Sequence, residues 1–335
     1  MKKLPFTFCL IMLVSLFVFS ENAIAGKKVV VFSASSKARA SQEVGYTEIY
    51  SGINEGFAPT IGDITLEYQW LEIGALADAT AKEAAGKLAI AQIKAVNPDL
   101  VIIIGDDNLR YVGQNIKDIP VVFAWLFSPI ESYKGLPQKN ITGIIQKFYT
   151  MDAWALAREI LGAKTVSMVS SENDFMIKAK ETILANVDPI EAGIGIRFKE
   201  MYLVKTFEEW KQAINTTTED FIYLGDTSRI LKDGKEMSRT EIVSWTMANA
   251  KKPVVASAEY DVADGALFSI VTSNKTSGNN AAKIAMEILI DGTSPENIPY
   301  MTNAKGRLAI NSITAQKLNI EIPYRVLSLA EKIYE

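Results

Sequence analysis

The feature that most constrains this chain is an alternation of short apolar runs with segments of helical periodicity. Lys28–Ser33 and Leu100–Ile104 are almost entirely apolar, as in strands that are buried on both faces. Between them, apolar residues recur every three or four positions over residues 46–57, which marks one face of a helix. Strands that alternate with helices in this way predict right-handed crossovers and a parallel sheet covered on both faces.

The same plan occurs twice. The string that runs from Asp99 through five apolar residues to Gly105 and Asp106 resembles the string from Asp220 to Gly225 and Asp226. Each is followed, past a predicted helix, by Pro-Val-Val, at residues 120–122 and 253–255. The shared order favours two related α/β lobes with parallel sheets.

Ligands of open parallel sheets bind outside the carboxyl ends of the strands. Two lobes that face each other place both sets of strand ends on one cleft between them. The candidate ligand-binding residues are therefore those that follow the predicted strands: Ser33, Ser35, Ser36, Asp106, Asp107, Asn108, Trp125, Phe127, Ser128, Asn173, Asp226, Thr227, Glu259 and Tyr260.

Several of these residues also have a purely structural interpretation. Asp106, Asp174 and Asp226 are expected to begin helices, where aspartate is favoured as a cap or by the helix dipole. Trp125 and Phe127 can equally pack in a core. Both interpretations stay open at the level of the sequence.

Acidic residues outnumber basic ones in these segments, and Arg229, Arg39 and Lys37 are the positive candidates. Acids, hydroxyls and aromatic faces together suit a ligand with an ammonium group and a flat or apolar part. Helix-start amides after Ser33 and Asp106 could hold a carboxylate. An amino acid meets these demands, an aromatic one among the options, and a nucleoside also fits.

Composition excludes several classes of chemistry. The chain has no histidine, and its single cysteine is Cys9, so Ser-His-Asp and Cys-His catalysis are ruled out. No calcium-loop motif of the Asp-x-Asp-x-Asp-Gly type occurs, and we expect neither a metal nor another cofactor. The net charge of −4 and the lack of a basic cluster argue against nucleic-acid binding.

Two weak motifs point to enzymes. Asp106 and Asp107 form an adjacent carboxylate pair, but neighbouring residues usually point in different directions, which argues against glycoside hydrolysis. Gly193 and Gly195 lack the further glycine of a dinucleotide fingerprint. We therefore expect a protein that is not an enzyme.

The N-terminus predicts export. Lys2 and Lys3 precede a short apolar core, and Ala23 and Ala25 are small residues at the positions that a signal peptidase reads. We expect residues 1–25 to form a cleaved signal peptide and the mature protein to be periplasmic. The residues before Cys9 do not form a lipobox, so no lipid anchor is expected.

Pieces spread over the mature chain resemble the periplasmic substrate-binding proteins of ABC importers with the type I binding-protein fold, in the subgroup that includes tryptophan-binding and other aromatic amino-acid-binding members. The pieces are the segments 98–105, 119–124, 128–129, 140–143, 258–266, 285–299 and 311–323. The resemblance implies two Rossmann-like lobes joined by a three-crossing hinge, with residues 26–143 and 274–301 in the first lobe and 144–273 and 302–335 in the second.

The resemblance also implies a function. Family members close their lobes over a small ligand and present it to an ABC permease in the inner membrane, and we expect this chain to act as a monomer. Many members carry Gly-Thr-Pro where this chain has Gly105 and Asp106, and Asp-Pro where it has Ser128 and Pro129. The ligand therefore stays open, and so does a role as a detached sensor for a receptor kinase.

Overall fold

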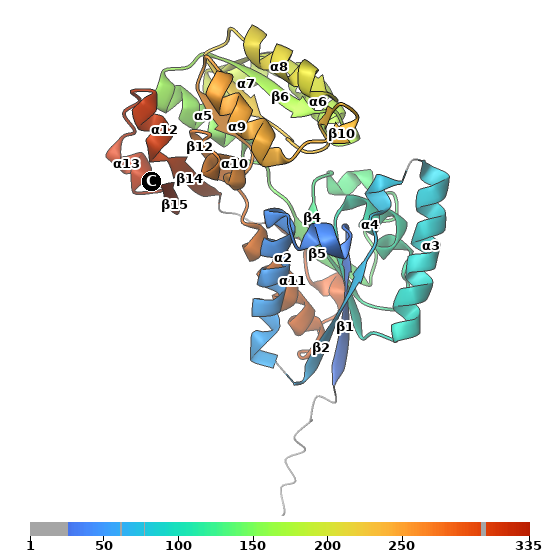
Figure 1. The fold of residues 1–335 in the computed structure, drawn as a ribbon. Helices are drawn as coiled ribbons and strands as arrows, with labels where there is room; N and C mark the ends of the chain where they lie inside the picture. The colour runs from blue at the N-terminus through green and yellow to red at the C-terminus, as the bar shows by residue number, and fades with distance from the viewer. Residues whose placement is uncertain (1–25, 61, 77, 303–305) are drawn as a thin grey trace, which may run out of the picture.

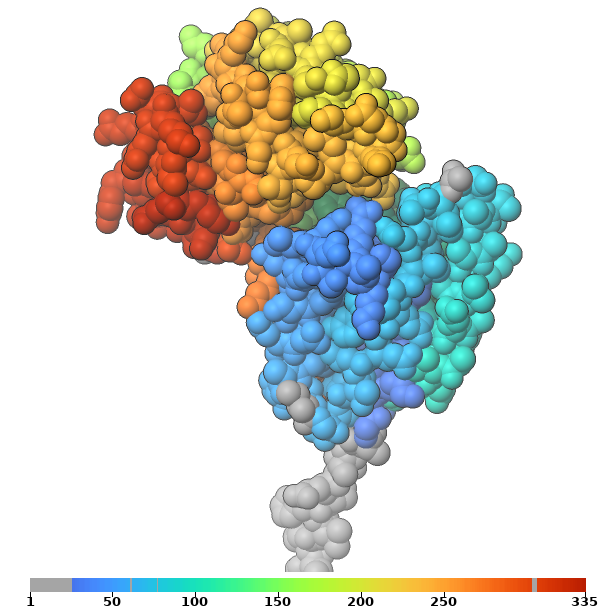
Figure 2. Space-filling view, in the orientation of Figure 1, coloured from blue at the N-terminus to red at the C-terminus, as the bar shows by residue number. Residues whose placement is uncertain are grey.

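The computed structural model describes residues 26–60, 62–76, 78–302 and 306–335. The predicted signal peptide lies outside these residues. The chain forms two lobes, one above the other in Figure 1, and Figure 2 shows a notch between them that opens to one side. Among the helices of the described residues, none is long and apolar enough to cross a membrane.

The first lobe is built on a six-stranded sheet in which all neighbouring strands are parallel. In spatial order the strands are β13 (Met301–Thr302), β5 (Ile141–Ile145), β4 (Val121–Leu126), β3 (Leu100–Ile104), β1 (Lys27–Ser33) and β2 (Ile64–Trp70). The parallel sheet that the apolar runs predict is confirmed.

Helices cover both faces of this sheet because the strand side chains alternate between two cores. Val29 and Val31 pack with α2 (Val44–Phe57) and α11 (Asn274–Leu289) on one face. Val30 and Phe32 pack on the other face with the remaining helices of the lobe. These remaining helices are α3 (Ala79–Val96) and α4 (Asp106–Tyr111), and a short helix α1 (Lys37–Ala40) follows β1.

The second lobe repeats the plan with a seven-stranded sheet. In spatial order its strands are β15 (Lys332–Tyr334), β14 (Arg307–Asn311), β12 (Phe268–Val271), β11 (Val254–Ala256), β8 (Phe221–Leu224), β6 (Thr165–Ser171) and β7 (Arg197–Val204). Only the β12–β14 pair of this sheet is antiparallel. The sheets are therefore mostly parallel, and the expected α/β class is confirmed.

Two cores again lie on the two faces of this sheet. Trp154 on one face and Trp210 on the other are fully buried. The helices of this lobe are α5 (Thr150–Leu161), α6 (Asp174–Leu184), α7 (Val187–Ile194), α8 (Phe207–Thr216), α9 (Arg239–Asn249), α10 (Glu259–Ala263), α12 (Ser312–Lys317) and α13 (Tyr324–Leu327). A small antiparallel hairpin, β9 (Leu231–Lys232) and β10 (Lys235–Glu236), follows β8.

The chain passes between the lobes three times: from β5 to α5, from β12 to α11 and from β13 to β14. The first two connections are linked, because the Thr272 hydroxyl donates a hydrogen bond of 2.9 Å to the Lys147 carbonyl. The first-lobe sheet reaches Ile145 and Thr302, slightly beyond the boundaries at 143 and 301 that the resemblance implies. Those boundaries stay a prediction.

Helices α2 and α11 approach closely enough that only glycine fits between them. A Cβ atom on Gly278 would lie 2.0 Å from the Ile49 carbonyl oxygen, and one on Gly52 would lie 1.9 Å from the Lys275 carbonyl oxygen. Both helices cover the same face of the first-lobe sheet, so the distance between them determines how they pack against its strands.

We predict that Gly278→Ala lowers the free energy of unfolding by about 1–3 kcal/mol, because the helices must move apart to admit the methyl group. Chemical denaturation of both proteins measures the difference. Gly193→Ala is the control, since Gly193 lies in α7 and a Cβ atom added there would meet no atom within 4 Å. It should be neutral or stabilising, by up to about 1 kcal/mol. Equal stabilities of the two variants would contradict the packing argument.

Candidate functional site

The carboxyl ends of the first-lobe strands point toward the second lobe (Figure 1). Residues after β1, β3 and β4 therefore meet residues after β6, β8 and β11 across the space between the lobes. We call this space the interlobe cleft. Each lobe contributes one of its two walls.

A row of aromatic rings runs along the cleft from one lobe to the other. Tyr46 on α2 packs edge-on against Trp125, with ring centroids 4.6 Å apart, and Trp125 lies 5.6 Å from Phe127. Phe127 is 6.2 Å from Phe175 on α6 of the second lobe. Phe148, in the first hinge connection, completes the row at 5.3 Å from Phe175. We call these five residues the aromatic row.

The backbone of Trp125 is held in a conformation that is rare for a large side chain. Its φ of 60° lies in the left-handed region, where the pairing of β4 with β5 shifts register. Close contact with α2 supports this geometry, because a Cβ atom on Gly45 would lie only 3.2 Å from the Trp125 ring. Strained backbone of this kind is typical of functional sites. The Trp125 side chain is only partly buried and also packs against the core of the first lobe, so its contact with a ligand stays a prediction.

Asp226 lies on the second-lobe wall, directly after β8 and Gly225. Its carboxylate accepts hydrogen bonds from the Asn173 side-chain amide at 3.1 Å and from the Ser228 amide at 2.9 Å. The expectation that Asp226 begins a helix is wrong: the chain turns there into the β9–β10 hairpin. Asp106 and Asp174 do begin helices, α4 and α6.

Tyr260 and Glu259 lie on the same wall, at the start of α10. The Arg239 guanidinium lies 4.2 Å from the Tyr260 ring centroid. Burial raises the pKa of Tyr260, and the charges of Asp261, Asp226 and the first-lobe residue Glu43 raise it further. Glu259 forms an ion pair with Arg307 at 3.0 Å.

Asp106 is used within its own lobe. Its carboxylate accepts hydrogen bonds from the backbone amides of Phe127, at 2.9 Å, and Ser128, at 2.6 Å, and from the Tyr133 hydroxyl at 2.5 Å. It therefore fixes the loop after β4 that carries part of the aromatic row. A direct ligand contact by Asp106 stays a prediction.

Asp107 points elsewhere. It forms ion pairs with Lys82 on α3 at 3.0 Å and with Arg110 at 3.2 Å. The two adjacent carboxylates therefore interact with different parts of the lobe, and Asp106 and Asp107 do not share one reaction centre.

Four other predicted residues, Ser33, Ser35, Asn108 and Thr227, are buried beneath the cleft walls. The Ser33 hydroxyl is hydrogen-bonded to the Tyr50 hydroxyl, and the Asn108 amide donates to the Ile104 carbonyl at 3.1 Å. Ser36 caps α1 by accepting from the Arg39 amide. These residues support the cleft walls in this structure, and their contact with a ligand stays a prediction.

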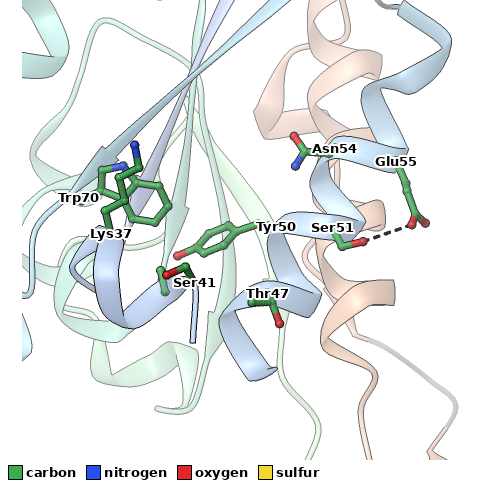
Figure 3. Close-up of a pocket in the computed structure, with 9 residues that line it drawn as sticks. Lys37, Ser41, Thr47, Tyr50, Ser51, Asn54, Glu55 and Trp70 are labelled. Atoms are coloured by element: carbon green, nitrogen blue, oxygen red, sulfur yellow. Dashed lines mark hydrogen bonds between the residues drawn. The ribbon is translucent and has the colours of Figure 1, made fainter. Parts of the chain in front are cut away.

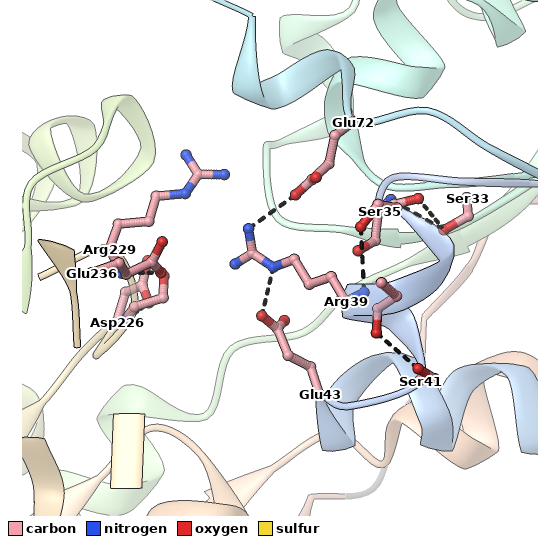
Figure 4. A network of polar contacts seen from close by, with 12 residues as sticks. Ser33, Ser35, Arg39, Ser41, Glu43, Glu72, Asp226, Arg229 and Glu236 are labelled. Carbon is pink, nitrogen blue, oxygen red and sulfur yellow. Dashed lines mark hydrogen bonds and ion pairs between the residues drawn. The ribbon is translucent and has the colours of Figure 1, made fainter. Parts of the chain in front are cut away.

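Two arginines project into the cleft (Figure 4). Arg39 on α1 forms ion pairs with Glu43 at 2.5 Å and Glu72 at 2.9 Å. Burial lowers the pKa of Arg39, but the hydrogen bonds and charges of the two glutamates outweigh it and raise the pKa. Arg229 extends toward Arg39 from the other lobe.

The sequence identifies both arginines as positive candidates but does not place them in the site. It also gives no direct indication of Tyr46, Phe148 and Phe175. Tyr46 follows the helical period of α2, which predicts a core position, while Phe148 and Phe175 lie outside the predicted strand ends. The one available signal for Phe175 is its position directly after Asp174, the first residue of a helix.

A shallow depression of about 510 Å³ lies on the first lobe between α1, α2 and β2 (Figure 3). Trp70 and Tyr50 pack edge-on there, with centroids 5.4 Å apart, and the Ser51 hydroxyl donates to Glu55 at 3.2 Å. The lining residues are Lys37, Ala40, Ser41, Thr47, Tyr50, Ser51, Asn54, Glu55 and Trp70. Within the described part of the chain, no group of three or more acidic, histidine or cysteine residues is arranged to hold a metal ion.

The contacts of Asp106 and Asp107 predict that substitution by asparagine lowers the free energy of unfolding by different amounts at the two positions. Asp106→Asn should lower the free energy of unfolding by about 1–3 kcal/mol, because an amide cannot accept all three hydrogen bonds. Asp107→Asn removes ion pairs near the surface and should cost about 0–1 kcal/mol. Chemical denaturation compares the two, and an equal or larger cost for Asp107→Asn would contradict the assigned role of Asp106.

Asp261 predicts a pH dependence of stability. Burial raises its pKa to about 7 from an ordinary value of 3.8, although its ion pair with Arg239, at 2.7 Å, acts in the opposite direction, and the charges of Asp264 and Asp226 add to the rise. Between about pH 4 and pH 7, the Asp261 carboxyl is therefore mostly protonated in the folded state and mostly ionised in the unfolded state. Stability from this group is present below about pH 4 and is lost as the pH rises through about 7.

We predict that Asp261→Asn flattens this dependence, which amounts to at most about 1.4 kcal/mol per pH unit for one group. Denaturation curves between pH 4 and 8 measure the slopes. Asp264→Asn removes the other carboxylate that contacts Arg239, at 2.9 Å, and should retain most of the slope. An unchanged slope in Asp261→Asn would show that Asp261 is ionised throughout this range.

Comparisons with known proteins agree with this architecture. A relative from Clostridioides difficile (strain R20291), described as a tyrosine-binding protein, is 25% identical over 235 residues; the match spans 67% of this chain and 64%, less than two thirds, of that protein. A structure from Streptococcus pneumonia, described as an ABC domain in complex with L-Trp, has a TM-score of 0.69 at 22% identity and covers 92% of this chain and 99% of its own.

The ligand-free, open structure of a substrate-binding protein with adhesive properties from Clostridium difficile has a TM-score of 0.67 at 17% identity, and it covers 92% of this chain and 99% of its own. At these identities the two solved structures support the fold alone. The family model described as ABC transporter substrate binding protein matches residues 43–334. The chain therefore belongs to the ABC transporter substrate-binding protein family.

Proposed function

We propose that this protein binds an amino acid with an aromatic side chain in the interlobe cleft and delivers it to an ABC importer. The observation that carries the proposal is the position of Asp226. Asn173 and the Ser228 amide hold its carboxylate on the second-lobe wall, and that wall faces the first-lobe end of the aromatic row. A carboxylate and a set of rings are the complementary groups for an ammonium and an aromatic side chain.

The charge of the cleft supports an amine-bearing ligand. The Asp226 carboxylate is only partly buried and has two hydrogen-bond donors, so it can accept more. Lobe closure would remove its remaining water, and a buried carboxylate that lacks sufficient donors is costly. A ligand ammonium would supply both donors and charge. The tyrosine-binding relative supports the same class of ligand.

The family implies a small-molecule ligand and a permease partner. We further infer that the mature protein is exported through the predicted signal peptide, acts in the periplasm as a monomer, and carries out no catalysis. Lobe closure around the three-connection hinge would then be the signal that the permease reads.

We predict that Asp226→Asn weakens binding of the best aromatic amino acid by about 1–3 kcal/mol, the usual value of a charge-assisted hydrogen bond. A thermal-shift screen of L-tryptophan, L-tyrosine, L-phenylalanine, other amino acids and nucleosides selects the ligand, because a ligand that binds only the folded state raises the melting temperature. Calorimetry then measures the affinity of each variant.

Asp291→Asn is the matched control, since Asp291 is exposed just beyond α11, far from the strand ends, and its substitution should leave the affinity unchanged. Stabilisation by a nucleoside but by no amino acid would overturn the proposed ligand class. Chemical conversion of the ligand would overturn the assignment as a binding protein.

A further inference from the structure

The Arg39 guanidinium is held in place by two hydrogen bonds and can still donate further ones. Its Nε donates to Glu43 and one terminal nitrogen donates to Glu72, which holds the plane of the group in place. Among the described residues, the second terminal nitrogen has no hydrogen-bond partner. Arg39 lies on α1 at the cleft edge of the first lobe, and Figure 4 shows its guanidinium directed toward the second lobe. Fixed geometry of this kind reduces the entropy lost on binding a carboxylate.

Arg229 faces it from the second lobe. Its φ of 59° is left-handed, and its backbone amide donates to the Glu236 carboxylate at 3.0 Å, so the β9–β10 hairpin holds the chain in this turn. The Arg229 side chain is exposed, and within the described part of the chain its guanidinium forms no ion pair. In Figure 4 it extends from the wall that carries Asp226 toward Arg39.

Closure of the lobes would bring these two guanidinium groups together. Two positive charges that approach in a space from which water is being removed repel each other strongly unless an anion lies between them. Glu43 and Glu72 already accept hydrogen bonds from Arg39, so they are partly committed. A ligand carboxylate between the arginines would remove the repulsion and form charge-assisted hydrogen bonds to both.

The residues around Arg39 indicate where the ring and the ammonium group of such a ligand would lie. Tyr46 lies close to Arg39 in the fold, since its backbone amide donates a hydrogen bond of 3.1 Å to the carbonyl of Glu43, the residue whose carboxylate pairs with Arg39. Trp125 packs on Tyr46. A carboxylate held at Arg39 would therefore put the neighbouring carbon and its ring next to the aromatic row, with Asp226 on the opposite wall for the ammonium.

We propose that Arg39 and Arg229 form a clamp, with one arginine on each lobe, that binds the ligand carboxylate and makes closure depend on it. This rests on the proposed function and deepens it: the site would select amino acids with a free carboxylate and reject the corresponding amides and amines. The clamp also assigns the carboxylate to side chains rather than to the helix-start amides that the sequence suggested.

The test compares acids with their amides. Calorimetry on the full mature chain measures L-tryptophan against L-tryptophanamide, and L-tyrosine against L-tyrosinamide. We expect each amide to bind at least about 30-fold more weakly than its acid, since two charge-assisted contacts are lost. Small-angle scattering should show a smaller radius of gyration with the acid but not with the amide at the same concentration.

Substitutions of the two arginines test whether they cause the difference in affinity between acids and amides. Arg229→Gln should weaken L-tryptophan binding about tenfold or more. It should leave the binding of L-tryptophanamide unchanged or strengthen it, because the substitution removes one of the two charges that repel each other on closure. Arg39→Lys retains the positive charge but loses the planar guanidinium. It should weaken L-tryptophan binding by a smaller factor than Arg229→Gln does. Lys235→Gln removes a positive charge from the same hairpin and serves as the control, with no expected change.

The outcomes separate the two proposals. Equal affinity for acid and amide, or an equal loss of both in Arg229→Gln, would overturn the clamp and leave the proposed function standing; in that case Arg229 pairs with Glu43 or Glu72 on closure. No binding of any acid or amide would overturn the proposed function, and the clamp with it.

Discussion

Parallel strand pairing is the constraint on which the rest of this structure depends. A parallel ladder places the carboxyl ends of neighbouring strands at one edge of the sheet, so residues from distant parts of the sequence meet there. In this chain both sheets present that edge to the same space. Trp125 near the carboxyl end of β4 and Asp226 after β8 are about a hundred residues apart in sequence, yet they belong to the two walls of one cleft.

The walls of the cleft carry two kinds of group, which are held in position in different ways. The rings of the aromatic row provide apolar surface and depend on packing, which is why the strained backbone of Trp125 is supported by the close approach of Gly45. The charged groups are held by hydrogen bonds with their neighbours: the Asn173 amide donates to Asp226, and Arg39 donates to Glu72. Both kinds are positioned before any ligand arrives, which lowers the entropy that binding costs.

The strands and most helices of the fold could be predicted from the sequence because their signal is local. Apolar runs such as Leu100–Ile104 and the helical period of α2 depend only on neighbours along the chain. The expectation that Asp226 begins a helix is wrong because aspartate after a strand is equally compatible with a turn. A helix follows β3, but a hairpin, with left-handed residues at Arg229 and Asp233, follows β8.

The composition of the site could be predicted less well, because its contacts are not local. The partners of the Asp106 carboxylate are 21, 22 and 27 residues away in sequence, and nothing in the letters indicates that they meet. The side-chain direction of Asp107, toward α3, and the arrival of Phe175 from the second lobe are likewise products of tertiary packing. The strand ends predict the region of the candidate site, and tertiary packing decides which side chains face the interlobe cleft.

The second hinge connection limits how the lobes can move. Only residues 272–273 separate the end of β12 from the start of α11, and the Thr272 hydroxyl fastens them to the first connection. Two residues span at most about 7 Å of extended chain, so neither lobe can slide far along the other. The motion left to the molecule is rotation about an axis near this point. Residues far from that axis then travel farther than residues near it, so a small rotation at the hinge becomes a larger displacement at the mouth of the cleft.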